Sequence, residues 1–135
     1  MTLVDTNVLL DLATDDPLHA PWSLAQLEAA ALRGPLLIDD VVYAELSVRY
    51  ARIEDLDAFV SRAGLRHDPI PRAALFLAGK AFLAYRRSGG RRTGVLLDLF
   101  IGAHAAVRGL ALLTRDTGRY RTHFPSVELI TPQEG

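Results

Sequence analysis

The sequence predicts an α/β protein with three layers (α/β/α), in which helices cover a central, mainly parallel sheet of four to five strands. Short apolar runs alternate along the chain with segments of helical periodicity, and strands separated by helices favour parallel pairing. A parallel strand buried on both faces has a continuous apolar sequence, and these runs have that character. The chain has 135 residues and half of them are apolar. This is enough for one domain, residues 1–135, with one hydrophobic core.

Caps and stop signals delimit the elements of the first half. Thr6 or Asn7 can cap the first helix, because a side-chain oxygen there accepts from an N–H of the first turn. The apolar residues of the second helix recur at helical spacing, and residues 33–35 (Arg-Gly-Pro) end it. Asp39 or Asp40 can cap the third. The expected elements are a strand at 3–4, helices at 7–12 and 22–31, a strand at 36–38 and a helix at 41–50.

The second half continues the alternation of helices and strands. Its first helix has an apolar face formed by Ile53, Leu56, Phe59 and Val60. A basic, glycine-containing loop at 88–94 separates two longer helices. The expected elements are a helix at 53–60, an extended segment at 65–70, helices at 72–87 and 97–107, a strand at 110–113, a connecting turn with Tyr120 and Phe124, and a strand at 127–130.

Composition excludes several classes of protein. The chain has no cysteine, which rules out disulfides and thiolate zinc sites and permits a reducing compartment. The N-terminus lacks a basic region followed by a long apolar core, so we expect no signal peptide and a cytoplasmic location. The apolar stretch 94–113 could imitate a membrane span, but Asp98, His104 and Arg108 interrupt it. The net charge of −1 gives no global attraction to nucleic acid, although a local patch can still bind it.

Four acidic residues end or interrupt the apolar segments: Asp5, Glu45, Asp98 and Asp116. Asp5 and Asp116 follow expected strands, Glu45 lies one turn into the helix after the second strand, and Asp98 begins the helix leading into the next strand. In an open α/β sheet, ligands gather at the carboxyl ends of the strands. A carboxylate beside a core is costly unless something compensates its charge. The four acids therefore predict one shared site.

A hard divalent cation is the simplest compensation for such a site. Crowded carboxylates repel one another and raise each other's pKa values. Mg²⁺, with Mn²⁺ as a possible substitute, prefers oxygen ligands and needs neither histidine nor cysteine. The chemistry that follows is metal-assisted hydrolysis of a phosphodiester, in which the ion orients a water, lowers its pKa and neutralises charge on the phosphate.

Each acid taken alone also has a structural interpretation. Asp5 can cap the first helix, and Asp98 can cap the helix at 97–107. Glu45 can be a solvated helix residue, and Asp116 can be a turn residue. A shared site is the interpretation that explains all four together.

The segments around the four acids resemble those of PIN-domain ribonucleases, and most closely VapC-type toxins of toxin–antitoxin pairs. The resemblance covers essentially the whole chain as one PIN-like domain and implies a Mg²⁺-dependent endoribonuclease. It implies that Asp5 and Asp98 hold the metal, that Glu45 and Asp116 complete its shell or position water, and that Asn7 and Thr114 orient the carboxylates. It also implies an RNA substrate, a cognate antitoxin that covers the site, and a homodimer. The matching segments are residues 3–10, 42–46, 98–105 and 112–116.

Two other functions remain open from the residues. A haloacid-dehalogenase-like phosphatase also has an Asp after its first strand, but its general acid would be a second Asp where this chain has Asn7. A non-catalytic RNA- or protein-binding module could keep a relict acidic pocket. His104 is expected to be a packed or hydrogen-bonded histidine rather than a ligand.

Arginines supply nearly all of the basic side chains, and some are candidates for phosphate contact. Arg115 and Arg119 lie near the expected site. Arg91 and Arg92 lie in the basic loop, where the alternative is a solvated helix end whose charge favours the negative end of the helix dipole.

Overall fold

A five-stranded sheet forms the centre of the protein in a computed structural model, which describes residues 1–132 apart from the side chain of Arg119. The strand order is β3-β2-β1-β4-β5, and every neighbouring pair is parallel. The expected sheet is thereby confirmed, with five strands. The single domain over residues 1–135 stays a prediction, and residues 133–135 lie outside the described range. The strands are β1 (Thr2–Val4), β2 (Leu36–Ile38), β3 (Leu65–His67), β4 (Ala111–Leu113) and β5 (Leu129–Ile130).

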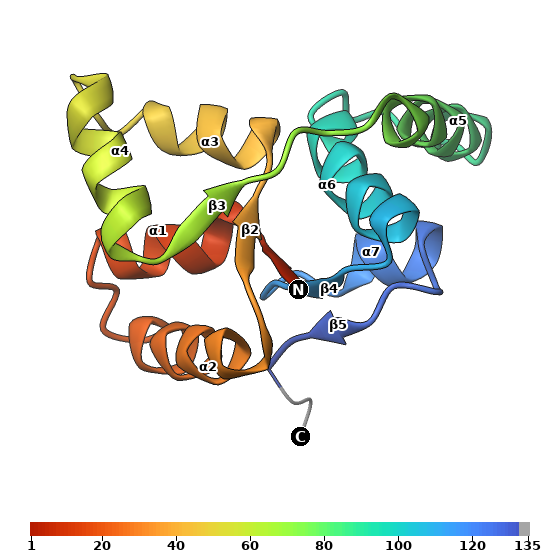
Figure 1. Ribbon diagram of the computed structural model, residues 1–135. Helices are drawn as coiled ribbons and strands as arrows, with labels where there is room; N and C mark the ends of the chain where they lie inside the picture. The colour runs from red at the N-terminus through yellow and green to blue at the C-terminus, as the bar shows by residue number, and fades with distance from the viewer. Residues whose placement is uncertain (133–135) are drawn as a thin grey trace.

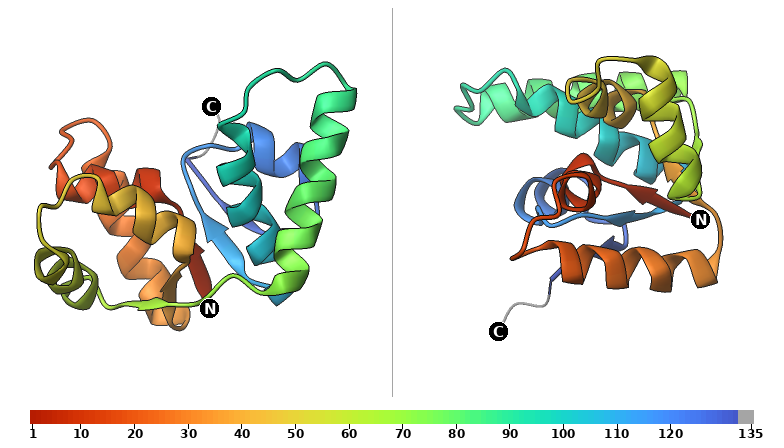
Figure 2. Two further views of the ribbon diagram at one scale, coloured as in Figure 1. Left: turned by 90° about the horizontal axis from the view of Figure 1, so that it is seen from above. Right: turned by 90° about the vertical axis from the view of Figure 1, so that its left-hand side faces the viewer.

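Helices cover both faces of this sheet, as expected for three layers (Figure 1). Helices α1 to α4 lie on one side of the central strands and α5 to α7 on the other (Figure 2). Helix α5 packs along α6, and α6 also contacts α7 and β4. The helices are α1 (Thr6–Ala13), α2 (Ala20–Arg33), α3 (Asp40–Ser47), α4 (Ile53–Arg62), α5 (Arg72–Arg87), α6 (Val95–Arg108) and α7 (Gly118–His123).

The core is built around the central strand β1. Leu3 pairs in register with Leu37 of β2 and Leu112 of β4, and Leu3 and Leu112 have no exposed surface. Burying a leucine in this way contributes roughly 1.5–3 kcal/mol. Trp22 and Phe59 are only partly buried and pack against the outside of this core. Burial on both faces therefore explains the apolar character of β1, β2 and β4, whose residues are all buried.

Two helix starts differ from the expected ones. The cap of α1 is Asp5, not Thr6 or Asn7, because Asp5 is extended (φ −74°, ψ 154°) and its side chain accepts from the N–H of Thr6. Helix α6 begins at Val95, so Asp98 lies within its first turn and does not cap it. For α3, the cap is Asp39, whose Oδ1 accepts from the N–H of Val42 at 3.0 Å. The structural interpretation of Asp98 as a cap is therefore wrong.

The expected connecting turn after β4 is the short helix α7. It places Tyr120, 1% exposed, and Phe124, 4% exposed, against α6. Gly102 of α6 makes this approach possible. A Cβ atom at Gly102 would lie 2.4 Å from Cδ2 of Phe124 and 3.0 Å from Cδ1 of Tyr120. The glycine is thus a site of close packing between α6 and α7.

The apolar stretch at 94–113 divides into helix α6 and strand β4, as the sequence predicted. Within the described residues, no helix combines the length and apolar character needed to cross a membrane.

Candidate functional site

The carboxyl ends of the parallel strands form an edge rich in acceptors. The residues directly after β1, β2 and β3 are Asp5, Asp39 and Asp68, and the residue after β4 is Thr114. All five strands point the same way, so these side chains start from one edge of the sheet. They divide into two networks, one around Asp5 and one around His104.

Asp5 lies at the centre of the first network and is only 5% exposed. Its Oδ1 accepts from the N–H of Thr6 at 2.7 Å. Its Oδ2 accepts from Thr114 Oγ1 at 2.8 Å, from Tyr120 OH at 3.0 Å and from Asn7 Nδ2 at 3.3 Å. The carboxylate is therefore fixed by donors from the loop after β4, from α1 and from α7.

Asp5 is nevertheless a costly carboxylate to ionise. Burial raises its pKa above the ordinary value, and the nearby charge of Glu45 adds to this. The hydrogen bonds from Thr114, Tyr120 and Thr6 lower the pKa but only partly offset the burial. A bound cation would stabilise the ionised form of this buried carboxylate, and the hydrogen bonds already hold the carboxylate in place as a ligand. The carboxylates of Asp5 and Glu45 offer only oxygen atoms as metal ligands, and a hard divalent ion prefers oxygen ligands.

Asn7 and Thr114 join the loops that follow β1 and β4. Asn7 Nδ2 also approaches Thr114 Oγ1 at 3.3 Å, and Asn7 Oδ1 accepts from the N–H of Arg115 at 3.2 Å. Thr114 Oγ1 accepts in turn from the N–H of Asp116 at 3.0 Å. Thus one network contacts the carboxylate of Asp5 and the backbone of Asp116. These contacts are the ones that an orienting role for Asn7 and Thr114 requires.

Glu45 reaches the same edge from α3. Its Oε1 accepts from Thr6 Oγ1 at 2.7 Å, and Thr6 also binds Asp5 through its backbone N–H. Thr6 therefore holds the two acids beside each other. Only a capping role was predicted for Thr6, so this contact between α1 and α3 was not expected.

Tyr120 is the second residue that sequence reasoning did not assign to the site. Burial and the charge of Asp5 raise its pKa well above the ordinary value, and the charges of Asp116 and Glu45 raise it further. Three of the four predicted acids therefore act electrostatically on one buried phenol. At neutral pH this phenol stays protonated and donates to Asp5.

Asp98 approaches from α6. It is half-buried and lies in the first turn of that helix, four residues before Gly102. Residues four apart share a face of a helix, and the face at Gly102 is the one on which Tyr120 packs. Asp98 thus lies one turn along α6 from the ring that binds Asp5.

A tighter acidic cluster lies elsewhere and contains none of the four predicted acids. Among the residues that the structure describes, Asp11, Asp16 and His19 bring one ligand atom each within 4.8 Å of one another. Arg115 donates to both oxygens of Asp11, at 2.7 Å from Nε and 2.8 Å from Nη2, and Ser23 Oγ donates at 2.6 Å. Asp11 is therefore already neutralised by protein groups, and the cluster is explained by structure alone.

The same ion pair gives Arg115 a structural role. Its guanidinium binds a carboxylate that is 3% exposed, and the expected contact with RNA stays a prediction. Breaking a buried pair of this kind is costly, so Arg115 anchors the loop after β4 to α1. The side chain of Arg119 lies outside the described part of the chain.

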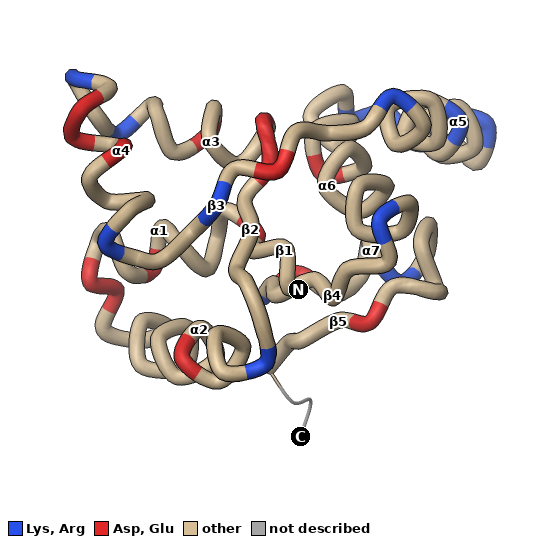
Figure 3. The backbone as a smooth tube through the Cα atoms, in the orientation of Figure 1, with Lys and Arg blue, Asp and Glu red and all other residues tan. Residues whose placement is uncertain are grey.

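Arg91 and Arg92 lie in the loop between α5 and α6, with both side chains exposed. Arg86 and Arg87 occupy the last turn of α5 immediately before this loop. Basic residues gather along α5 and at this end of it (Figure 3). The loop is therefore an exposed basic surface next to the start of α6, the helix that carries Asp98.

The second network is centred on His104, which has no exposed surface. Its Nδ1 lies 3.1 Å from Asp39 Oδ2, and its Nε2 lies 2.7 Å from Asp68 Oδ2. Arg108 binds both oxygens of Asp68 at 3.1 Å. His104 is thus hydrogen-bonded through both ring nitrogens, as the sequence predicted for a structural histidine.

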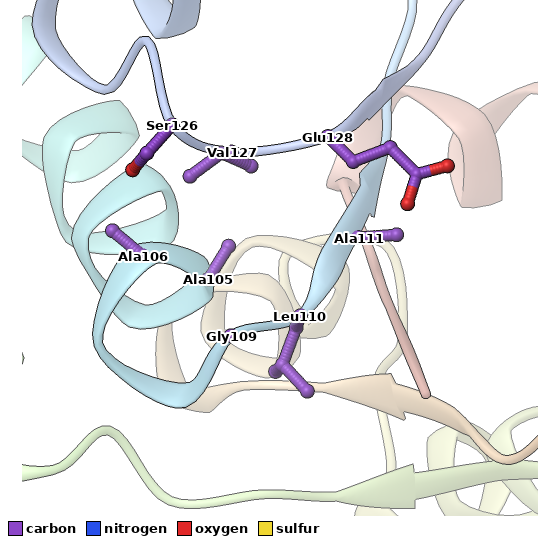
Figure 4. Close-up of a pocket in the computed structure, with 8 residues that line it drawn as sticks. All are labelled: Ala105, Ala106, Gly109, Leu110, Ala111, Ser126, Val127 and Glu128. Atoms are coloured by element: carbon purple, nitrogen blue, oxygen red, sulfur yellow. The ribbon is translucent and has the colours of Figure 1, made fainter.

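A small hollow lies at the other end of the sheet (Figure 4). It has a volume of about 150 Å³ and is lined by the end of α6, the start of β4 and the segment before β5. Its one charged residue, Glu128, pairs with Arg33 at 3.4 Å. The hollow therefore offers no chemistry comparable with the carboxyl edge.

Comparisons with known proteins agree with this geometry. The chain is similar in fold to VapBC2 from Rickettsia felis bound to a DNA fragment from its promoter (TM-score 0.72, 18% identity, covering 96% of this chain and 97% of that chain). It is also similar to a toxin–antitoxin complex from Klebsiella pneumoniae (TM-score 0.66, 22% identity, 99% of each chain). DNA-bound VapBC from Salmonella typhimurium gives a TM-score of 0.69 at 18% identity over 96% of each chain. A comparison with curated proteins gave no match.

The family assignment rests on a direct match. The PIN domain model matches residues 2–125, from the start of β1 to the residue after Phe124. This range includes all four predicted acids and both networks at the carboxyl edge. The resemblance seen in the sequence motifs is thereby confirmed, and the chain belongs to the PIN-domain family.

Proposed function

We propose that this protein is a Mg²⁺-dependent endoribonuclease that acts in the cytoplasm as the toxin of a toxin–antitoxin pair. The observation that carries the proposal is the buried Asp5 carboxylate. It is fixed by three side-chain donors, its pKa is raised, and Glu45 lies close to it. Membership of the PIN-domain family supports a nuclease, and the toxin–antitoxin complexes among its structural neighbours support the biological role.

In this proposal Asp5 and Asp98 hold the metal ion, and Glu45 and Asp116 complete its shell or position water. The ion supplies an activated water and neutralises the charge that develops on the scissile phosphate. Thr6 keeps Glu45 beside Asp5, and the loop after β4 keeps Asp116 near the same carboxylate. In this proposal the four acids come from the end of β1, from α3, from α6 and from the loop after β4.

The partners follow from the same role. RNA is the substrate, and the exposed Arg91 and Arg92 contact its phosphates. A cognate antitoxin protein binds this chain, which forms a homodimer. Asn7 binds Asp5 and Thr114 through its amide, and an amide has no proton acidic enough for the general-acid role that a dehalogenase-like phosphatase needs at this position.

Removal of the metal is the test of this function. Purified protein is expected to cleave RNA with Mg²⁺, to lose cleavage when EDTA is added, and to regain it when Mg²⁺ or Mn²⁺ is restored. Gel analysis of a labelled RNA pool measures this directly. Asp5→Ala, purified in the same way, controls for contaminating nucleases. Equal cleavage by all samples would contradict the proposal, and no cleavage by any would favour a binding module.

A further inference from the structure

We propose that Tyr120 is a positioning residue for the metal site. Its hydroxyl holds Asp5 so that Oδ1 is the oxygen presented to the cation, and its ring sets Asp5 at a fixed distance from α6. The inference rests on the proposed function, since it needs a metal at Asp5. It goes beyond that function by assigning a role to a residue outside the acidic set.

The two oxygens of Asp5 have unequal surroundings. Oδ2 takes all three side-chain donors, from Thr114, Tyr120 and Asn7. A carboxylate offers about four lone-pair positions, two on each oxygen, so Oδ2 is saturated. Within the described residues Oδ1 takes one donor, the N–H of Thr6 at 2.7 Å. The remaining lone pair of Oδ1 is therefore the one that can bind a cation.

Tyr120 differs from the other two side-chain donors because it lies on α7, a helix that covers one face of the sheet. Thr114 and Asn7 lie on the segments that directly follow β4 and β1, whereas Tyr120 comes from α7. Its ring is 1% exposed and packs at Gly102 of α6. A tyrosine side chain is rigid, with two rotatable angles, and its polar tip needs a partner when buried.

This placement makes the phenol a spacer between two proposed ligands. The hydroxyl end contacts Asp5, and the ring lies on α6 one turn from Asp98. The absence of a side chain at Gly102 lets the ring approach the helix this closely. Removing the hydroxyl should leave the ring packed on α6 while one of the three side-chain hydrogen bonds to Asp5 is lost.

The conservative variant Tyr120→Phe makes that change. Loss of a group that orients a metal ligand costs about 10- to 100-fold in metal affinity. We therefore expect Tyr120→Phe to bind Mn²⁺ at least about 10-fold more weakly than the wild type. The tested quantity is the dissociation constant of Mn²⁺, obtained from the free-ion signal in electron paramagnetic resonance without RNA.

Tyr50→Phe is the matched control, because Tyr50 is half-buried in the segment between α3 and α4, and its ring is tilted against that of Phe59 with 6.2 Å between the ring centres. Unchanged Mn²⁺ affinity in Tyr50→Phe with a weakened Tyr120→Phe supports the inference. Wild-type affinity in Tyr120→Phe overturns it while leaving the proposed function intact. Absence of Mn²⁺ binding by the wild type overturns both.

Urea unfolding verifies that Tyr120→Phe is folded. If that variant does not fold, Gly102→Ala tests the same spacer from the other side, because its methyl group displaces the rings of Tyr120 and Phe124. Weaker Mn²⁺ binding by folded Gly102→Ala supports the inference, and wild-type affinity overturns it.

Discussion

Asp98→Asn is expected to reduce RNA cleavage by more than about 100-fold, since losing a ligand costs more than the 10- to 100-fold caused by losing a group that orients one. Asparagine keeps the size of the side chain and removes its negative charge, and a neutral amide binds Mg²⁺ less strongly than a carboxylate. Asp98 is half-buried in the first turn of α6. The described hydrogen bonds to Asp5 come from Thr6, Asn7, Thr114 and Tyr120, so the variant tests the acid on α6 separately.

Initial cleavage rates of a defined RNA at saturating Mg²⁺ measure this effect. Asp55→Asn is the matched control, because Asp55 also lies in the first turn of a helix, α4, and is exposed to solvent. Both substitutions remove the same charge from a helix N-terminus. A rate for Asp98→Asn equal to that of Asp55→Asn would show that α6 contributes no ligand to the site.

His104→Ala is expected to lower the free energy of unfolding by about 3–5 kcal/mol, the cost of removing one partner from a buried ion pair. The side chains of His104 and Asp39 have no exposed surface, and that of Asp68 is 19% exposed. Both ring nitrogens face a carboxylate, which requires both to carry a proton. Alanine leaves Asp39 buried without this cation. It also removes the hydrogen bond between His104 of α6 and Asp39, the cap of α3.

The same network gives stability a defined dependence on pH. Burial lowers the pKa of His104, but hydrogen bonds and charges of Asp39 and Asp68 outweigh it, so the pKa is raised above 6.5. The contribution of His104 is therefore complete below pH 6.5 and is lost as the pH rises through the folded-state value. Burial raises the pKa of Asp68, but Arg108 and His104 lower it further, to below 3.8. Its contribution is complete above pH 3.8 and is lost as the pH falls through the folded-state value.

Urea unfolding of the wild type and His104→Ala across this pH range measures both effects. The difference in unfolding free energy between them is expected to shrink as the pH rises above 6.5. His67→Ala is the control, because His67 pairs with Asp40 on the surface, where the two side chains are 47% and 51% exposed. An exposed pair is worth at most about 1 kcal/mol. Equal destabilisation by the two variants would contradict a buried imidazolium.

The sequence predicted the fold well because its strongest signals are local. Strands β2 and β4 are continuous apolar runs, and α5 was predicted with its observed bounds, Arg72–Arg87. Helix α7 was missed because it has only six residues, mostly polar, and packing on Gly102 rather than helical periodicity places it. The sequence left the cap of α1 open, because Asp5, Thr6 and Asn7 are all good capping residues and only the backbone angles separate them.

Of the candidate site, only the acidic residues could be predicted from the sequence. An acid that ends an apolar run is visible in one sequence, and this identified the four carboxylates. Their partners are not visible, since Tyr120 lies 115 residues from Asp5 and Arg115 lies 104 residues from Asp11. The structural role of Arg115 was missed for this reason, because its buried partner could not be read from the sequence.

The most direct test of the central claim is to locate Mn²⁺ in crystals of the protein by its anomalous scattering. We predict a peak at coordination distance from Asp5 Oδ1 and a carboxylate oxygen of Asp98, with Glu45 and Asp116 around it. A sole peak between Asp11, Asp16 and His19, or none at the carboxyl edge at millimolar Mn²⁺, would contradict the account.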